Sequence, residues 1–173
     1  QLIFISLLFS ILSLSVSAQK PTKAEKAAQL EQEFQQTRQL IESNHFQFEL
    51  NRVYPQDGQD LSRFNPRGKF VITDSVAKGT LPFFGRAYSL PYGEGGGIEF
   101  DGVMKDQSLK IEHKKKRKIL IYRFSITAKN DTYQISMEIS GGGNCSVNLN
   151  SNNRAQISYS GTVSPVKDET GKS

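Results

Sequence analysis

The feature that most constrains the fold is an alternation of apolar and polar side chains that begins at His45 and continues to the end of the chain. Because successive side chains of a strand point to opposite faces, a period of two predicts strands with one buried face. The other face carries Gln, Glu, Ser, Thr and Arg, which is typical of antiparallel sheets with one face in solvent. The pattern is clearest in HFQFELNRVYP (45–55), ILIYRFSITA (119–128) and DTYQISMEIS (131–140).

Short turn-forming segments separate these runs, which indicates hairpins between neighbouring strands. We predict a mainly β domain, an antiparallel meander of about eight or nine strands that forms a curled sheet or a barrel-like structure. About eight strands close around either packed side chains or one small ligand. The remaining predicted strands are FVITD (70–74), SVAKGTLPF (75–83), GIEFDG (97–102), SLKIEH (108–113), NCSVNLN (144–150) and RAQISYSGTV (154–163).

One α-helix is predicted before the strands, within residues 19–44. Thr22 is expected to cap it, with Glu25 completing a Thr-x-x-Glu capping box, and Asn44 is a plausible stop. Apolar residues at helical spacing form one stripe, which we expect to pack on the protein's own sheet. The stripe consists of Ala27, Leu30, Phe34, Leu40 and Ile41.

The first 18 residues form an apolar run that ends in the small-residue pattern Val16-Ser17-Ala18. This pattern predicts a signal peptide over 1–18, cleaved after Ala18, and hence a periplasmic or secreted protein without a transmembrane span after cleavage. A membrane anchor is the alternative, but the run is at the short end of the roughly 17–25 residues that a span needs. The remaining layout is an amphipathic helix (19–44), an antiparallel β domain (45–166) and a disordered tail (167–173).

The net charge of +5 is modest. For an exported protein it favours an anionic glycan or lipid head group over nucleic acid, which such a protein seldom meets. The single cysteine, Cys145, excludes an intramolecular disulfide. It alternates with Val147 and Leu149, so we expect a buried and unreactive thiol.

No catalytic arrangement is visible in the sequence. His45 and His113 are the only histidines, and neither has a carboxylate or serine nearby in the pattern of a known catalytic group. Glu99 and Asp101 share one face of a strand, and we expect that face to lie outward. We therefore predict no catalytic residue, no metal site and no cofactor.

The segment LPFFGRAYSLPYGEGGGIEFDG (81–102) is the best candidate for binding. Its aromatic and polar side chains are of the kind that carbohydrate or peptide sites use, because flat rings supply area while polar tips fix orientation. The same residues could instead close one end of a barrel. The candidate site residues are Arg86, Tyr88, Tyr92 and Glu94, with Arg154 from a predicted turn in which Asn152 and Asn153 suit left-handed backbone.

A cationic segment, HKKKRK (113–118), falls at the tip of a predicted hairpin. Exposed lysines are ordinary at such tips, and no aromatic residues interleave them as in single-strand nucleic-acid sites. We interpret the segment as a solvated turn.

Segments 81–102 and LNSNNRAQISYSGTVSP (149–165) closely resemble a Bacteroidetes family known as domain of unknown function 4251. The resemblance extends from about residue 28 to 165. It implies a small exported envelope or secreted domain with no assigned reaction, so no catalytic residue is carried over from the family.

These features lead to three functional hypotheses. The first, which we favour, is a non-catalytic module of the cell envelope that binds a small ligand or glycan. The second is a structural or protein-interaction module, which would show an interior filled with Phe and Ile and an exposed apolar patch. A hydrolase whose carboxylates meet only in three dimensions is the third. The sequence leaves the oligomeric state open.

Overall fold

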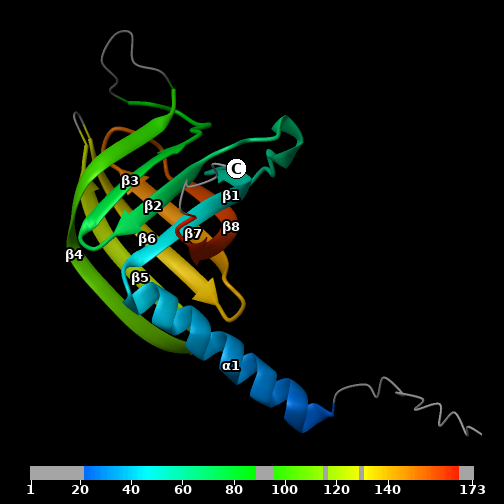
Figure 1. Ribbon diagram of the computed structural model, residues 1–173. Coiled ribbons are helices and arrows are strands. Elements are labelled where there is room, and N and C mark those ends of the chain that lie inside the picture. The colour runs from blue at the N-terminus through cyan, green and yellow to red at the C-terminus, as the bar shows by residue number, and fades with distance from the viewer. Residues whose placement is uncertain (1–21, 89–95, 115–116, 129–130, 168–173) are drawn as a thin grey trace, which may run out of the picture.

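The computed structural model describes residues 22–88, 96–114, 117–128 and 131–167, which form one α-helix followed by eight strands (Figure 1). A short 3-10 turn, Ser62–Phe64, follows the first strand. The elements are α1 (Lys23–Glu42), β1 (His45–Pro55), β2 (Lys69–Thr73), β3 (Val76–Leu81), β4 (Ile98–Lys114), β5 (Arg117–Thr127), β6 (Thr132–Ser140), β7 (Asn144–Ser151) and β8 (Ile157–Pro165).

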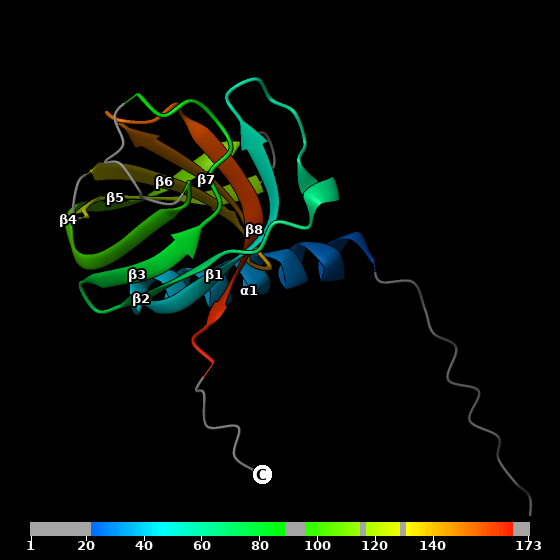
Figure 2. The same cartoon turned by 90° about the horizontal axis from the view of Figure 1, so that it is seen from above.

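The eight strands form a closed antiparallel barrel. Each strand pairs with the next along the chain, and β8 returns to pair with β1, with Phe46 opposite Pro165 and Pro55 opposite Ile157. Figure 2 shows the strands as a ring, with α1 beyond it at the far end. The predicted fold class is confirmed, and the sheet closes rather than remaining a curled open sheet.

One detail of the strand prediction is wrong. GIEFDG and SLKIEH are not separate strands but the two halves of β4, which continues through a β-bulge between Lys105 and Ser108. A bulge inserts an extra residue and breaks the alternation locally, so the sequence pattern is interrupted although the strand is not.

The barrel interior is packed with apolar side chains. Phe48 stacks on Phe70 with ring centroids 5.0 Å apart, and Phe70 contacts Phe100 at 5.8 Å. Isoleucines from β5, β6 and β8 are buried with them, among them Ile126, Ile135 and Ile157. An eight-stranded barrel is just wide enough for side chains to fill in this way. This packing leaves the two ends of the barrel as the places for a binding site.

Helix α1 begins as predicted. The Thr22 hydroxyl accepts a hydrogen bond from the Glu25 backbone N–H at 3.2 Å, and the Thr22 N–H donates to the Glu25 carboxylate at 2.7 Å, which confirms the capping box. The helix ends at Glu42, two residues before the predicted stop at Asn44, where a positive φ of 50° turns the chain into β1.

Only the C-terminal half of α1 packs on the barrel. Phe34 and Ile41 are buried, whereas Ala27 is exposed and Leu30 is 63% exposed. The prediction that the whole apolar stripe packs on the sheet is therefore wrong. The reason is geometric, because the N-terminal half of α1 extends past the barrel (Figure 1).

Cys145 is buried beside Val147 and Leu149, as predicted, and burial raises the pKa of its thiol. The outward placement of Glu99 and Asp101 is also confirmed, because both are exposed.

The left-handed backbone expected at Asn152 and Asn153 is not observed. The non-glycine residues with positive φ in the described ranges are Asn44, Asn65, Asp74 and Asp106. The connection from β7 to β8 is instead held by a hydrogen bond from the Asn153 N–H to the Ser151 hydroxyl at 3.0 Å and by an isolated bridge between Arg154 and Ala87.

The proposed signal peptide and most of the tail lie outside the described residues, so both stay predictions. Within the ranges described above, no helix is long and apolar enough to span a membrane.

Candidate functional site

The described residues of the predicted binding segment lie at the barrel end opposite α1 (Figure 1). Its residues pair with the β7–β8 connection. The Tyr88 N–H donates to the Asn153 carbonyl at 2.7 Å, and the Ala155 N–H donates to the Arg86 carbonyl at 2.9 Å. The structure therefore brings Arg86, Tyr88 and Arg154 to one corner. Tyr92 and Glu94, the other two predicted site residues, lie outside the described residues.

Arg154 points into this corner rather than outward. Its side chain is 5% exposed, its guanidinium lies 5.1 Å from the centre of the Phe83 ring, and Nη1 donates to the Gly96 carbonyl at 3.3 Å. Its Nε lies 3.8 Å from Asp131 Oδ2 and makes no hydrogen bond. These contacts join three separate segments, so Arg154 holds the corner together. Tyr88, in contrast, is 66% exposed.

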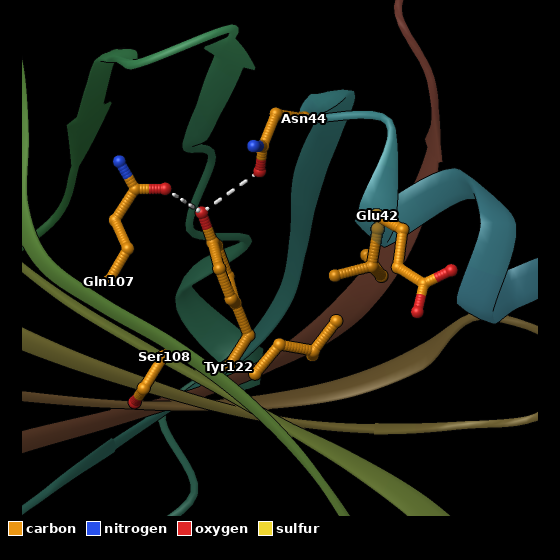
Figure 3. A pocket seen from close by; sticks show the side chains of 7 residues that line it. Glu42, Asn44, Gln107, Ser108 and Tyr122 are labelled. Carbon is orange, nitrogen blue, oxygen red and sulfur yellow. Dashed lines mark hydrogen bonds between the residues drawn. The ribbon is translucent and has the colours of Figure 1, made fainter.

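A pocket of about 230 Å³ lies toward the α1 end of the barrel (Figure 3). It is an open pocket, lined by the C-terminal turn of α1, the junction between α1 and β1, the bulge of β4 with the two residues after it, and one residue of β5. The residues that line it are Ile41, Glu42, Asn44, Gln107, Ser108, Leu109 and Tyr122.

The pocket exists because the β2–β3 hairpin is shorter than its neighbours. β3 pairs with β4 only as far as Val103, and the Met104 N–H then donates to the Ser75 carbonyl at 2.7 Å. The tip of the hairpin is fixed to α1's end by a bond from the Asp74 N–H to the Asn44 carbonyl at 2.8 Å. Beyond this tip β4 continues without β3, which leaves an opening in the barrel wall.

Tyr122 provides the central polar group of the pocket. The residue is 3% exposed, and its hydroxyl lies 3.1 Å from Asn44 Oδ1 and 2.9 Å from Gln107 Oε1 (Figure 3). A tyrosine hydroxyl has one hydrogen, so the two amide oxygens share it as acceptors. Burial raises the pKa of Tyr122 to about 12, so the hydroxyl is neutral at physiological pH.

The other lining groups keep the pocket close to neutral. Ile41 and Leu109 supply apolar surface, and Ser108 supplies a hydroxyl. The only charged lining residue, Glu42, pairs with Arg38 at 2.7 Å. In the described part of the chain, no group of three or more His, Cys, Asp and Glu side chains is placed to hold a metal ion.

This pocket was not predicted from the sequence. Tyr122 falls on the apolar face of the predicted strand 119–128 and is buried, whereas Asn44, the predicted helix stop, lies two residues past the end of α1. One signal of a polar site was present in the sequence: a tyrosine on a buried face, whose hydroxyl usually needs a hydrogen-bond partner. The identity of the partners could not be read, since Gln107 reaches Tyr122 only through the bulge in β4.

The fold defines this chain as a small antiparallel β-barrel protein with an N-terminal helix packed on one end. The sequence profile of the family "Domain of unknown function (DUF4251)" matches residues 28–163, and the chain belongs to this family. The resemblance seen in the sequence is thereby confirmed.

A crystal structure of a DUF4251 family protein from Bacteroides eggerthii DSM 20697 has a similar fold, with a TM-score of 0.56 and 23% sequence identity. The match covers 81% of this chain and 91% of that one. No curated protein matches the chain. The comparisons therefore support the family and the fold, and they assign no activity.

Proposed function

We propose that this protein is an exported, non-catalytic binding module that holds a small neutral polar ligand in the Tyr122 pocket. The observation that carries the proposal is that Asn44 and Gln107, from two other segments of the chain, both contact the Tyr122 hydroxyl in the wall of the pocket. Pockets that combine apolar surface with a few convergent polar groups are the usual form of small-molecule sites.

Size and charge define the ligand class. The volume of about 230 Å³ is below the roughly 300–1,000 Å³ of pockets for drug-sized ligands. A single sugar ring, or the end of a glycan chain, is of suitable size. The uncharged amides and hydroxyls would bind the ligand's hydroxyl groups, and Ile41 and Leu109 would contact its carbon-bound hydrogens.

A binding role agrees better with this pocket than a catalytic one. A general acid or base works best with a pKa near the operating pH. Tyr122, with a pKa of about 12, holds its proton too tightly to act as a base. Its amide neighbours do not titrate, and the carboxylate of Glu42 is engaged by Arg38.

Export is part of the proposal, and the apolar run over 1–18 supports it. The intact mass of the protein recovered from the envelope of its own cells tests this point. A chain that begins at Gln19 is the expected result, and a chain that retains the apolar run would contradict it.

Native mass spectrometry of the mature protein, purified from its own envelope, tests ligand binding. We expect a reproducible extra mass that is lost in Tyr122→Phe and retained in the Arg86→Ala/Tyr88→Ala variant. The reverse result would place the site at the opposite end of the barrel. A bare protein in every sample, also after addition of neutral monosaccharides, would favour the structural or protein-interaction alternative.

A further inference from the structure

The second half of β4 has one edge without a strand partner. β3 accompanies β4 only to Val103, whereas β4 continues to Lys114 with β5 on its other side. Within the described residues, no strand pairs with the remaining edge of β4 over residues 105–114, here called the open edge. Figure 1 shows β4 continuing past the β2–β3 hairpin toward α1.

The register shows which backbone groups face the open edge. The Met104 N–H points toward β3, so the backbone groups of Lys105 point toward β5, in agreement with a bond from the Ser125 hydroxyl to the Lys105 carbonyl at 3.4 Å. After the bulge, Ser108 lies opposite Arg123. Alternation along the strand then directs the N–H and C=O groups of Leu109, Ile111 and His113 to the open edge.

An unpaired edge of this kind is a template for another strand. The side chains beside it also offer some apolar contact, since Ile111 is 40% exposed and Leu109 is partly buried against the core. Extended peptides bind such edges through main-chain hydrogen bonds, and the neighbouring side chains determine which peptides bind.

The charge around the open edge indicates the kind of peptide. Between positions 105 and 123 the described residues include six Lys or Arg side chains and two Asp or Glu side chains. Lys114 pairs with Glu138 and Lys118 with Glu31. The other four basic residues have no ion-pair partner within the described ranges, and they are Lys105, Lys110, Arg117 and Arg123.

We propose that the open edge of β4 binds an extended, acidic segment of a partner protein by strand addition. A second copy of this chain is a poorer occupant, because pairing two such edges would bring basic side chains together and like charges opposite one another are destabilising. The open edge shares Leu109 with the proposed ligand pocket, but this inference depends on the backbone of β4 and not on the Tyr122 hydroxyl.

A synthetic ten-residue peptide of alternating Glu and Val, blocked at both ends, is a suitable probe. It would be titrated into ¹⁵N-labelled mature protein while amide chemical shifts are recorded. We expect the shifts to centre on Leu109, Ile111 and His113. Two control peptides, one with Lys in place of Glu and one with N-methyl groups on alternate backbone nitrogens, should each bind at least about tenfold more weakly.

The matched protein variants are Ile111→Pro and Ile111→Ala. Proline removes an N–H that faces the open edge and leaves the β4–β5 hydrogen bonds in place, and proline is tolerated on edge strands. Alanine keeps the N–H and removes only the side chain. We expect Ile111→Pro to weaken binding about tenfold or more and Ile111→Ala about threefold or less.

Three results would overturn the inference. The first is no shift at millimolar peptide. The second is equal binding of the N-methylated peptide, which would reduce the effect to charge attraction. The third is self-association of the unliganded protein through the same amides, which would make a second copy the occupant. The Ile111→Pro and Tyr122→Phe variants alter different groups, so failure here is distinguishable from failure of the ligand pocket.

Discussion

Tyr122 and Asn44 are 78 positions apart in the chain, and the Tyr122 hydroxyl lies 3.1 Å from Asn44 Oδ1. The contact connects a buried residue of β5 to the junction between α1 and β1. A buried hydroxyl in this position has consequences for stability at high pH as well as for binding.

Alkaline pH should destabilise the fold. Burial raises the pKa of Tyr122 from 10.0 to about 12 and also raises those of Tyr159 and Cys145. Above the unfolded-state pKa values the unfolded chain loses protons first, so the folded state binds more protons and its stability falls as pH rises. We expect the free energy of unfolding to decrease from about pH 9 upward, as measured by urea denaturation at a series of pH values.

The Tyr122→Phe variant is the control for that series. It removes one of the three groups, so its stability should decrease less steeply between about pH 10 and pH 12 than that of the wild type. Identical slopes for the two proteins would show that the Tyr122 hydroxyl has similar surroundings in the folded and unfolded states.

Gly161 is required where β8 approaches β1 to close the barrel. A Cβ atom at this position would lie 2.0 Å from the Glu49 carbonyl oxygen and 2.7 Å from the Phe48 ring. We expect Gly161→Ala to lower the free energy of unfolding by about 3 kcal/mol or more, because overpacking forces the backbone to shift. Gly102→Ala is the matched control, because its nearest contact would be 3.5 Å away. Equal melting temperatures for the two variants would argue against this closure.

Helix α1 is anchored by Phe34 and not by Leu30. Phe34 is 3% exposed and Leu30 is 63% exposed. Phe34→Ala should therefore cost about 3 kcal/mol of stability in chemical denaturation, and Leu30→Ala less than about 0.5 kcal/mol. A larger loss for Leu30→Ala would mean that the N-terminal half of α1 packs on something in solution.

Arg154 and Asp131 form a buried pair, with side chains 5% and 8% exposed. Arg154→Met should lower stability by about 3 kcal/mol, because it leaves the Asp131 carboxylate buried without its cation. Adding Asp131→Asn should recover part of that loss. Strict additivity of the two changes in a double-mutant cycle would contradict a direct interaction.

Local patterns predicted much of this structure. The capping box at Thr22, the strand His45–Pro55 and the burial of Cys145 depend on residues close in sequence, and each is confirmed. The closure of β8 on β1 depends on strand lengths and register around the whole barrel. Alternation along single strands does not contain that information.

The candidate site was harder to predict for a related reason. Arg154 resembles a surface ligand-binding residue in sequence, yet Phe83 and Asp131 enclose it. The Tyr122 pocket depends on the bulge in β4 and on the short β2–β3 hairpin, which together bring Gln107 to Tyr122. Neither feature produces a recognisable motif.

Ligand binding in the Tyr122 pocket can be tested directly by a chemical-shift titration of ¹⁵N-labelled mature protein with a panel of neutral monosaccharides. We expect at least one sugar to shift the amides of Asn44, Gln107 and Ser108, and we expect Tyr122→Phe to abolish these shifts and Tyr88→Phe to preserve them. Shifts centred on residues 86–88, or no shift with any sugar at high concentration, would contradict this expectation.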